Sequence, residues 1–259
     1  MVDPTTGNAG SSKRCLLAVT AHPDDEARII GGTLAKCAAE GVATAVLCAT
    51  RGERGSRGTP PLCSPEELSA VRERELREAC AILGVQDLRL LDHRDGELPT
   101  ADAGKVIGEI LQAFEDWRPQ VVITFGPEGR TGHPDHIAIH GFTAEAFRRA
   151  GGDAAPAKLY YMAFPRSIRD VIGPSFPGQP DEQIKLTLDV SPWLEIKRQA
   201  IAAHRTQVTP PFAHLSEARR WEILSREYYI LAASRLPNRP DHERDLFEGL
   251  FDPREAGHA

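Results

Sequence analysis

The stretch CLLAVTAHPDDE, residues 15–26, runs from apolar side chains directly into one imidazole and three carboxylates. An apolar run of this length followed by polar residues is typical of a buried strand that ends in a loop. We therefore expect a strand over 15–20, with His22, Asp24, Asp25 and Glu26 presented at its exit. One histidine and three acids in so short a loop have the composition of a metal site with a base attached.

A second stretch repeats this arrangement much later in the chain. The sequence VVITF at 121–125 predicts another buried strand, and GHPDH at 132–136 follows it. His133 and His136 are three residues apart at the expected start of a helix, so their side chains lie on the same face. Asp135 between them can orient an imidazole and raise its basicity. Two such clusters, each after a strand, predict one shared active site.

The pattern around the clusters predicts a Rossmann-like α/β fold. Helices are expected over about 27–40, 64–83, 100–117 and 134–150, and further strands over 42–49 and 88–91. Strands that alternate with helices of this length form right-handed crossovers and a mostly parallel sheet flanked by helices. Ligands bind beyond the carboxyl ends of the strands in such sheets. Both clusters and the loops 51–55 and 92–97 are expected there.

The chain beyond residue 157 is expected to form a C-terminal α+β extension. Strands are predicted over 158–164, 184–190 and 228–232, helices over 193–204 and 216–224, and a Pro/Gly-rich loop over 165–180. We interpret residues 13–252 as a single domain, with a Rossmann-like core at 13–150 and the extension at 151–252. Segment 1–12 and the closing segment 253–259 are predicted to be flexible tails.

Composition narrows the function classes. With a net charge of −6 over 259 residues, there is no electrostatic reason to expect a nucleic-acid partner. No run approaches the roughly 20 apolar residues that span a bilayer, and the N-terminal segment lacks an apolar signal core. The five cysteines form no CxxC pair and favour the reduced cytoplasm. We expect a cytoplasmic enzyme with a small-molecule substrate, and homo-oligomer formation stays open.

Zinc chemistry fits the two clusters. Zinc takes His nitrogen and carboxylate oxygen, and a catalytic site supplies three protein ligands while one position stays open for water. That set can be supplied by His22, Asp25 and His136, with Fe2+ as an alternative metal. Because adjacent carboxylates in a tight loop point in different directions, Asp24 can act as the base that takes a proton from water. His133 would then face the reacting carbonyl.

Four sequence features together resemble the LmbE-like (PIG-L) family of zinc-dependent N-acetylglucosaminyl deacetylases. They are AHPDDE at 21–26, GHPDH at 132–136, the Gly-rich loop after the second strand, and Lys197-x-x-Ala200-x-x-x-His204-x-x-Gln207. The resemblance implies zinc-dependent hydrolysis of an N-acetyl or similar N-acyl amide on an amino sugar, such as an N-acetylglucosamine conjugate.

The resemblance also implies a role for each residue of the two clusters. The three zinc ligands of the family correspond to His22, Asp25 and His136. Asp24 corresponds to the general base. His133, with Asp135 behind it, corresponds to the general acid or to the positive charge that stabilises the oxyanion. Two positions depart from the pattern, since Arg28 stands where relatives often have a small or apolar residue, and Thr131 where some have tyrosine.

Other polar residues near the clusters allow two interpretations. Arg51, Glu53 and Asp95 are candidate sugar contacts, because charged groups on crevice loops bind hydroxyls, and loop bracing is the equal alternative. Glu26 is expected to support the loop rather than to bind metal. His140, one turn after His136, is expected to be a supporting or core residue rather than a ligand.

Residues farther from the clusters are expected to serve packing. The charge run at 71–78 has helical spacing and predicts a solvated face, from which Arg72 could brace the crevice. His204 and Gln207 are expected to pack the C-terminal part, and Trp193 and Trp221 to lie in the core.

Functions of other classes remain as alternatives. A nucleotide-binding module is disfavoured, because the first strand-to-helix turn lacks GxGxxG and carries carboxylates that would repel a phosphate. An amidase acting on a thiol–sugar conjugate, a phosphoesterase, and a metal-binding sensor without catalysis use the same residues. Metal content together with acetate release from N-acetylglucosamine derivatives separates these alternatives.

Overall fold

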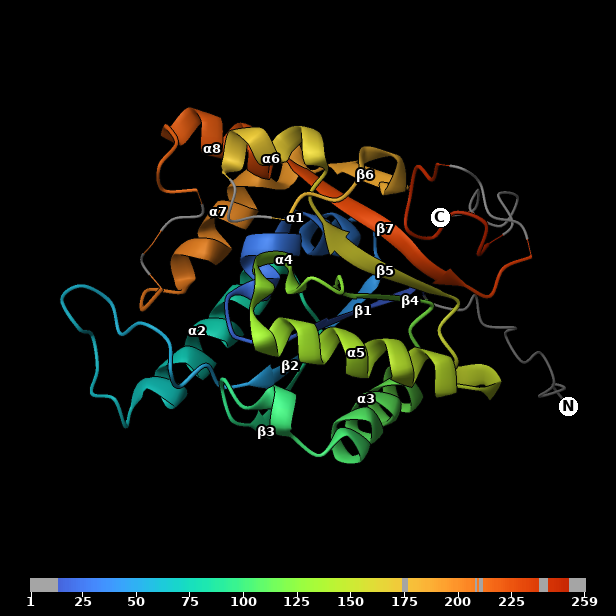
Figure 1. Ribbon diagram of the computed structural model, residues 1–259, viewed down its shortest axis with the longest axis horizontal. Helices are drawn as coiled ribbons and strands as arrows, with labels where there is room; N and C mark the ends of the chain where they lie inside the picture. The colour runs from blue at the N-terminus through green and yellow to red at the C-terminus, as the bar shows by residue number, and fades with distance from the viewer. Residues whose placement is uncertain (1–13, 174–176, 208, 210–211, 238–241, 252–259) are drawn as a thin grey trace, which may run out of the picture.

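A computed structural model describes residues 14–173, 177–207, 209, 212–237 and 242–251. The predicted tails at 1–12 and 253–259 lie outside these residues. Within the described residues, seven strands form one sheet in the order β3-β2-β1-β4-β5-β7-β6 (Figure 1). Their bounds are β1 Cys15–Thr20, β2 Ala43–Thr50, β3 Asp87–His93, β4 Val121–Phe125, β5 Lys158–Ala163, β6 Leu186–Asp189 and β7 Arg226–Ser234.

The sheet is parallel over its first five strands and antiparallel at one edge. The pairs β1–β2, β2–β3, β1–β4 and β4–β5 are parallel, whereas β7 pairs antiparallel with both β5 and β6. This is the doubly wound order in which neighbours are joined by crossover helices. The predicted Rossmann-like class is confirmed, and the C-terminal part extends the same sheet.

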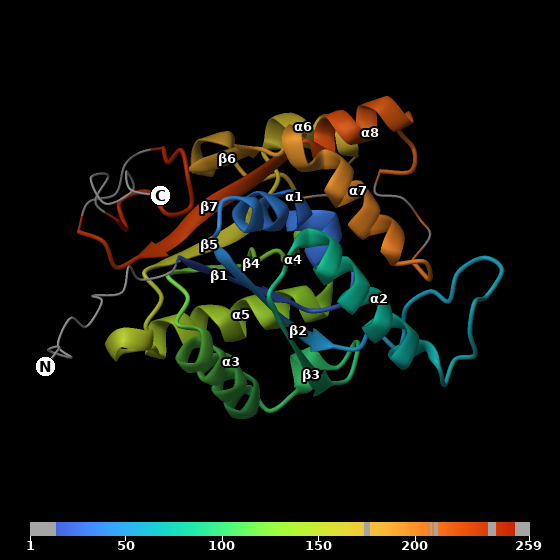
Figure 2. The ribbon, with the colours of Figure 1, turned by 180° about the vertical axis from the view of Figure 1, so that it is seen from behind.

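Helices cover both faces of the sheet (Figures 1 and 2). On one face α1 Asp25–Ala39, α2 Leu68–Leu83 and α7 Leu194–Ala203 contact one another, and on the other α3 Ala103–Trp117 packs on α5 Pro134–Arg149. Shorter helices are α4 Gly129–Gly132, α6 Arg166–Ile172 and α8 Glu217–Leu224, with 3-10 turns at Leu98–Thr100, Gly152–Ala154, Asp181–Gln183 and Ser191–Trp193. None of the described helices is both long and apolar enough to cross a membrane.

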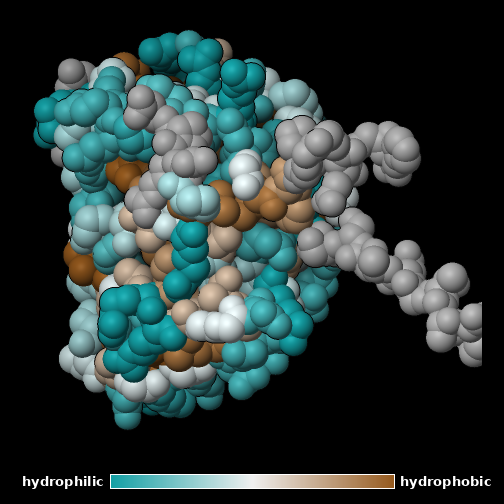
Figure 3. Space-filling view, turned by 90° about the vertical axis from the view of Figure 1, so that its right-hand side faces the viewer, coloured by the Kyte–Doolittle hydropathy of each residue, from teal (hydrophilic) through white to brown (hydrophobic). Residues whose placement is uncertain are grey.

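The central strands are buried on both faces, as parallel strands between two helix layers must be. Every residue of β1 and of β4 is buried, and the apolar core runs continuously from these strands into the flanking helices. At the surface, the face drawn in Figure 3 shows hydrophilic residues around a central band of hydrophobic ones. The rigid core therefore lies directly beneath the loops that carry the two acidic–histidine clusters.

The prediction of a loop over the Pro/Gly-rich segment 165–180 is wrong in part, because residues 166–172 form α6. The segment is helical because its apolar side chains have a partner. Ile172 is buried, and Ile168 and Val171 pack against the same small cluster, which contains Phe164 and Phe212. This cluster forms between distant parts of the chain, so the local composition carries no signal for it.

Helix α1 begins at Asp25, earlier than predicted, and is broken at Ile30, whose φ of −125° and ψ of 17° are not helical. The Glu227 carboxylate occupies the break and accepts hydrogen bonds from the backbone N–H groups of Gly32 and Thr33 at 2.9 and 2.8 Å. At Gly32 a Cβ atom would lie 2.4 Å from Val190 Cγ2, so only glycine allows this approach. The break at Ile30 therefore separates the first turn of α1 from the rest of the helix.

Candidate active site

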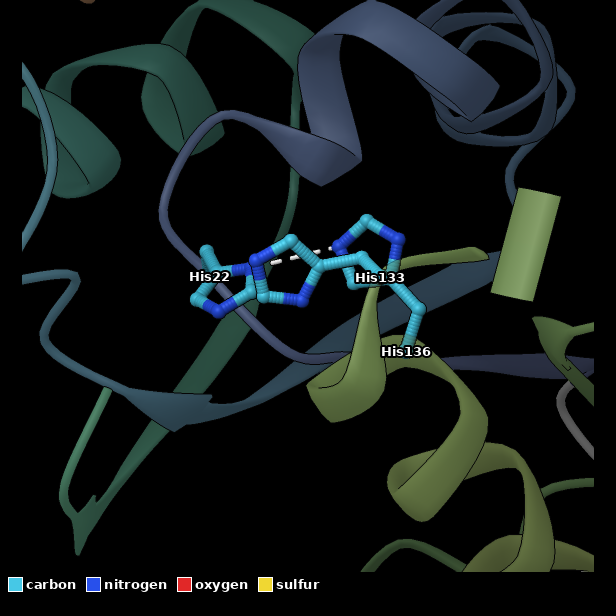
Figure 4. A group of neighbouring side chains, drawn as sticks. All are labelled: His22, His133 and His136. Carbon is cyan, nitrogen blue, oxygen red and sulfur yellow. Dashed lines mark hydrogen bonds between the residues drawn. The ribbon is translucent and has the colours of Figure 1, made fainter. Parts of the chain in front are cut away.

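The loop after β1 and the start of α5 bring two imidazoles into contact. His22 Nδ1 lies 3.2 Å from His136 Nε2, and both side chains are buried (Figure 4). The Asp25 carboxylate completes a triangle of residues, with Oδ1 at 3.5 Å from His136 Nε2 and its other oxygen, Oδ2, at 3.7 Å from His22 Nδ1. The loop after β1 and the start of α5 therefore bring two rings and one carboxylate together.

The outer nitrogen of each imidazole faces a hydrogen-bond acceptor. His22 Nε2 lies 3.1 Å from both Asp95 Oδ1 and Asp135 Oδ2, and His136 Nδ1 lies 3.1 Å from the carbonyl oxygen of Gly129. Each outer nitrogen must carry a proton to make these bonds. The two inner nitrogens then face each other with lone pairs at 3.2 Å, an arrangement that needs a cation or a shared proton between them.

The triangle fits a tetrahedral metal. Bonds of 2.0–2.1 Å place the ligand atoms of such a site about 3.4 Å apart, close to the 3.2 Å between the two ring nitrogens and the 3.5 Å between His136 Nε2 and Asp25 Oδ1. Asp25 is held in place by its other oxygen, since Oδ2 accepts hydrogen bonds from the backbone N–H groups of Ala21 and His22. The residues His22, Asp25 and His136 could therefore hold a metal ion.

Two other groupings of possible ligands share His22. One adds His133 to His22 and His136, and the other combines His22 with Asp95 and Asp135. In the second, backbone N–H groups already bind the carboxylates, since Asp135 Oδ2 accepts from Gly96 at 2.6 Å and Asp95 Oδ2 accepts from Arg54 at 3.0 Å. That group is better described as a hydrogen-bonded support on the outer side of His22.

The electrostatics of the site favour positive charge. Burial alone would lower the pKa of His22, but the carboxylates of Asp135 and Asp95 outweigh it and raise that pKa to about 10. Burial similarly opposes ionisation of Asp25, yet His136 and His22 hold its pKa below the usual range. A buried group of carboxylates around one imidazole is a favourable environment for a bound cation.

Asp135 has a different partner from the one predicted. The sequence suggested that it supports His133, but its carboxylate contacts His22 and accepts hydrogen bonds from the backbone N–H groups of Gly96 and Leu98. Asp135 lies at the buried start of α5, where the loop after β3 supplies these donors. Asp135 of the second cluster therefore supports His22 of the first cluster.

His133 forms the N-cap of α5, and its Nδ1 accepts a hydrogen bond from the backbone N–H of Asp135 at 3.2 Å. In the neutral ring the proton is then on Nε2, so His133 offers an N–H donor. Its ring centroid lies 4.7 Å from that of His22 and 4.8 Å from that of His136 (Figure 4). The cap thus fixes a donor beside the possible metal ligands.

Asp24 lies in left-handed backbone, with a φ of 107°. Each of its oxygens faces an arginine, with Oδ2 at 2.8 Å from Arg28 Nε and Oδ1 at 3.2 Å from Arg72 Nη2. Burial raises the pKa of Asp24 to about 6, against the lowering effect of Arg72. The carboxylate stays ionised at neutral pH and has a pKa suited to proton transfer.

Glu26 and His204 form a buried pair behind this loop. Glu26 Oε2 accepts a hydrogen bond from the backbone N–H of Asp24, and Oε1 lies 2.7 Å from His204 Nε2. Glu26 therefore supports the loop as expected, but nothing in the sequence indicated that its partner would be His204. The only available signal was the spaced motif that contains His204 and Gln207, which identified a family pattern without a contact.

The carboxylates of Asp95 and Glu53 accept hydrogen bonds from other groups of the protein. Asp95 is buried, with one oxygen on His22 and the other on the backbone of Arg54, and Glu53 Oε1 accepts from the backbone N–H of Asp95 at 3.0 Å. Arg51 pairs with Glu73 and lies 3.3 Å from Asp92. All three predicted substrate contacts thus have bracing partners, and Arg51 and Glu53 also line a polar pocket.

The remaining predicted residues lie farther from the donor triangle. His140 Nδ1 lies 2.9 Å from the carbonyl oxygen of Phe125, and its ring contacts Tyr161, so it is outside the possible metal groups of the described residues. Thr131 is exposed. Arg72 is buried and donates to the carbonyl oxygens of Gly52 and Pro23. Arg72 thus braces the loop after β1, and Glu75 of the same charge run is also buried, so the predicted solvated face is wrong at these two positions.

Comparisons with known proteins identify relatives of this chain. The 1D-myo-inositol 2-acetamido-2-deoxy-alpha-D-glucopyranoside deacetylase of Thermobifida fusca (strain YX) is 36% identical over 90% of this chain and 99% of its own. The structure of a conserved protein from Thermus thermophilus is 30% identical, with a TM-score of 0.62 over 87% of this chain and 96% of that one.

A third similarity is in fold. N,N'-diacetylchitobiose deacetylase from Pyrococcus horikoshii superimposes with a TM-score of 0.66 over 84% of this chain and 83% of that one, at 21% identity. Residues 17–147, which include both clusters, match the family described as GlcNAc-PI de-N-acetylase, PIG-L. The chain belongs to the PIG-L (LmbE-like) family.

Proposed function

We propose that this protein is a zinc-dependent hydrolase that removes an N-acetyl, or similar N-acyl, group from an amino sugar such as an N-acetylglucosamine conjugate. The observation that carries the proposal is the approach of His22 Nδ1 and His136 Nε2 to 3.2 Å beside the Asp25 carboxylate. We assign these three residues as zinc ligands. When bound, the metal would polarise the amide carbonyl and increase the acidity of a water molecule.

Asp24 is the proposed general base. Its neighbour Asp25 faces the ligand triangle, while Asp24 is partly exposed, with 18% of its side chain accessible to solvent. It is thus able to accept a proton from the attacking water. Arg28 and Arg72 hold one oxygen each, which fixes the carboxylate in orientation before substrate binds.

His133 is the proposed partner of the amide. Its Nε2–H, fixed by the helix cap on Nδ1, supplies a donor for the developing oxyanion, and a protonated His133 would deliver a proton to the leaving nitrogen. Asp135 acts from outside, because its carboxylate holds the His22 proton on Nε2 and leaves Nδ1 free for the metal. His133 would thus act on the substrate, whereas Asp135 would act on the metal ligand His22.

The relatives suggest which substrate to try first. The Thermobifida fusca relative acts on an acetamido sugar carried on inositol, so we infer a glucosaminyl conjugate with a polar aglycone for this chain. Arg51, Glu53 and Asp95 are the proposed contacts for the sugar or the aglycone, since they surround the polar pocket or border the metal group.

The test combines metal analysis with acetate release. Purified protein should contain one zinc per chain and release acetate from N-acetylglucosaminyl-inositol, and Asp24→Asn should abolish turnover while the metal is retained. Loss of metal in that variant would show that the roles of the two aspartates are reversed. Zinc binding with acyl release only from a different amide would identify an amidase instead. Zinc binding without any hydrolysis would favour a sensor.

A further inference from the structure

Arg28 connects the proposed base to a distant part of the chain. It lies in the first turn of α1, four residues after Asp24, and its Nε is 2.8 Å from Asp24 Oδ2. The other two nitrogens donate to backbone carbonyl oxygens 181 and 179 residues away, Nη1 to Thr209 at 2.9 Å and Nη2 to Gln207 at 2.6 Å. One guanidinium therefore joins the carboxylate of Asp24 to the chain after α7.

The residues that accept these bonds are themselves held in place. We call residues 204–207 and 209 the anchor segment. Thr206 donates to the buried carboxylate of Glu75 through its backbone N–H at 2.9 Å and its hydroxyl at 2.6 Å. Gln207 Nε2 donates to the carbonyl oxygen of Ser56 at 2.8 Å. Helix α7, which precedes the segment, contacts both α1 and α2 (Figure 2). Arg28 thus reaches a fixed part of the C-terminal extension.

The two arginines at Asp24 contribute in different ways. Arg72 comes from α2, is buried, and lies 3.2 Å from Oδ1. The terminal torsion of an aspartate is broad, so a carboxylate that is held through one oxygen can still turn about that contact. A second cation on Oδ2 fixes the plane of the carboxylate. Arg28 supplies this cation, and the anchor segment fixes Arg28.

This connection needs the shape of a guanidinium. Its planar fork presents several N–H donors at fixed angles, so one side chain can bind a carboxylate and two carbonyl oxygens at once. A lysine ammonium is a point charge on a flexible stem and can pair with the carboxylate without holding the same geometry. The two carbonyl acceptors also restrict the rotamers of Arg28, which is 21% exposed.

We propose that Arg28 is a positioning residue, which ties the carboxylate of Asp24 to the anchor segment. This inference rests on the proposed function. Arg28 acts through Asp24 and leaves the contacts with the substrate to other residues. A displacement of about 1 Å at a reacting group can lower a rate about 100-fold. The anchor segment therefore contributes to the rate, although it lies outside both acidic–histidine clusters.

Steady-state acetate release by zinc-loaded protein tests this role. Arg28→Met keeps an unbranched side chain and should lower kcat about 10- to 100-fold, with KM and zinc content unchanged, because the base is displaced. Arg28→Lys should recover part of kcat, since its ammonium can still pair with Asp24. The matched control is Arg149→Met, because Arg149 Nε also pairs with a carboxylate four residues earlier, Glu145 at 2.6 Å, but in the last turn of α5. Its kcat should equal that of wild type.

A second variant tests the path through the anchor segment. Gln207→Ala removes the bond to Ser56 and keeps the backbone carbonyl that Arg28 uses. It should lower kcat in the wild-type background and have a smaller effect when combined with Arg28→Met. A difference of about twofold or more between the two effects is expected for residues of one hydrogen-bond network. Losses that simply multiply would contradict the path through the segment.

Four results would overturn the proposal. An unchanged kcat in Arg28→Met would remove its positioning role, and a raised KM at unchanged kcat would place Arg28 on the substrate instead. Loss of zinc would place the effect on the metal ligands, and an equal loss of kcat in Arg149→Met would make it nonspecific. If Arg28→Met fails to fold, Arg28→Lys and Arg28→Gln decide. A wild-type protein that hydrolyses no amino-sugar amide would overturn the proposed function as well, whereas full turnover in Arg28→Met would overturn only this inference.

Discussion

Replacement of Asp135 by asparagine tests how the two clusters act on each other. Asp135 is fully buried, and its carboxylate serves three donors: His22 Nε2 at 3.1 Å, Gly96 N at 2.6 Å and Leu98 N at 3.2 Å. Asparagine keeps the size but exchanges one acceptor oxygen for an NH2 donor, so at least one of these N–H groups must face another donor. His22 then loses one of the two carboxylates that hold its proton on Nε2, and Asp95 remains as the other.

The expected loss of zinc affinity in Asp135→Asn follows from these contacts. A hydrogen bond to a charged group contributes about 1.5–3 kcal/mol, and removal of the carboxylate behind a metal-binding histidine typically lowers metal affinity about 10- to 100-fold. The two ranges agree, because each tenfold change corresponds to about 1.4 kcal/mol. We therefore expect the zinc dissociation constant of Asp135→Asn to rise about 10- to 100-fold.

Competition with a chromophoric zinc chelator measures this dissociation constant, and circular dichroism shows whether the variant is folded. Asp116→Asn is the matched control, because Asp116 also serves a cation, Arg89, and an amide, Gln112, but on the surface. It should bind zinc as wild type does. A folded Asp135→Asn protein whose zinc affinity is within threefold of wild type would refute the assignment of His22 Nδ1 as a ligand supported from outside.

The other predictions concern the ligands, the base, the helix break and the metal itself. His136→Ala should lose zinc and acetate release together, as shown by metal analysis, and a variant that keeps stoichiometric zinc would exclude this residue as a ligand. Asp24→Asn should keep zinc but lose about 100-fold or more in kcat, and an unchanged kcat would exclude it as the base. Gly32→Ala should destabilise the protein by about 1–3 kcal/mol, because its Cβ would collide with Val190, and a thermal midpoint equal to wild type would contradict the close approach. Removal of zinc with a chelator should lower the thermal midpoint and readdition should restore it, since a ligand that binds only the folded state stabilises it.

The sheet and the meeting of the clusters could be predicted because both depend on local patterns. The strands over 15–20 and 121–125 have the predicted bounds, since unbroken apolar runs between polar residues admit one interpretation. Parallel strands then place their carboxyl ends at one edge, which brings His22 and His136 together without knowledge of any side-chain contact.

Partners that come from other parts of the chain could not be predicted in this way. Asp135 was expected to support its neighbour His133, yet the donors that hold it belong to the loop after β3. Arg72 was predicted to brace the crevice from a solvated helix face, yet it is buried, and nothing local indicated its partners, the carbonyl oxygens of Gly52 and Pro23. Helix α6 depends on a distant apolar cluster. In each case the deciding interaction is tertiary, and no local periodicity records it.

The three carboxylates around His22 would favour the proposed divalent cation over a shared proton. Asp25, Asp95 and Asp135 are all buried, and each lies within 3.1–3.7 Å of a nitrogen of His22. A shared proton between His22 and His136 supplies one positive charge against three negative ones in a low-dielectric environment. A divalent ion supplies two and replaces the lone-pair contact by two bonds. The backbone N–H groups that bind the carboxylates offset the remaining negative charge. The protein would therefore fix the donor atoms before the proposed ion binds.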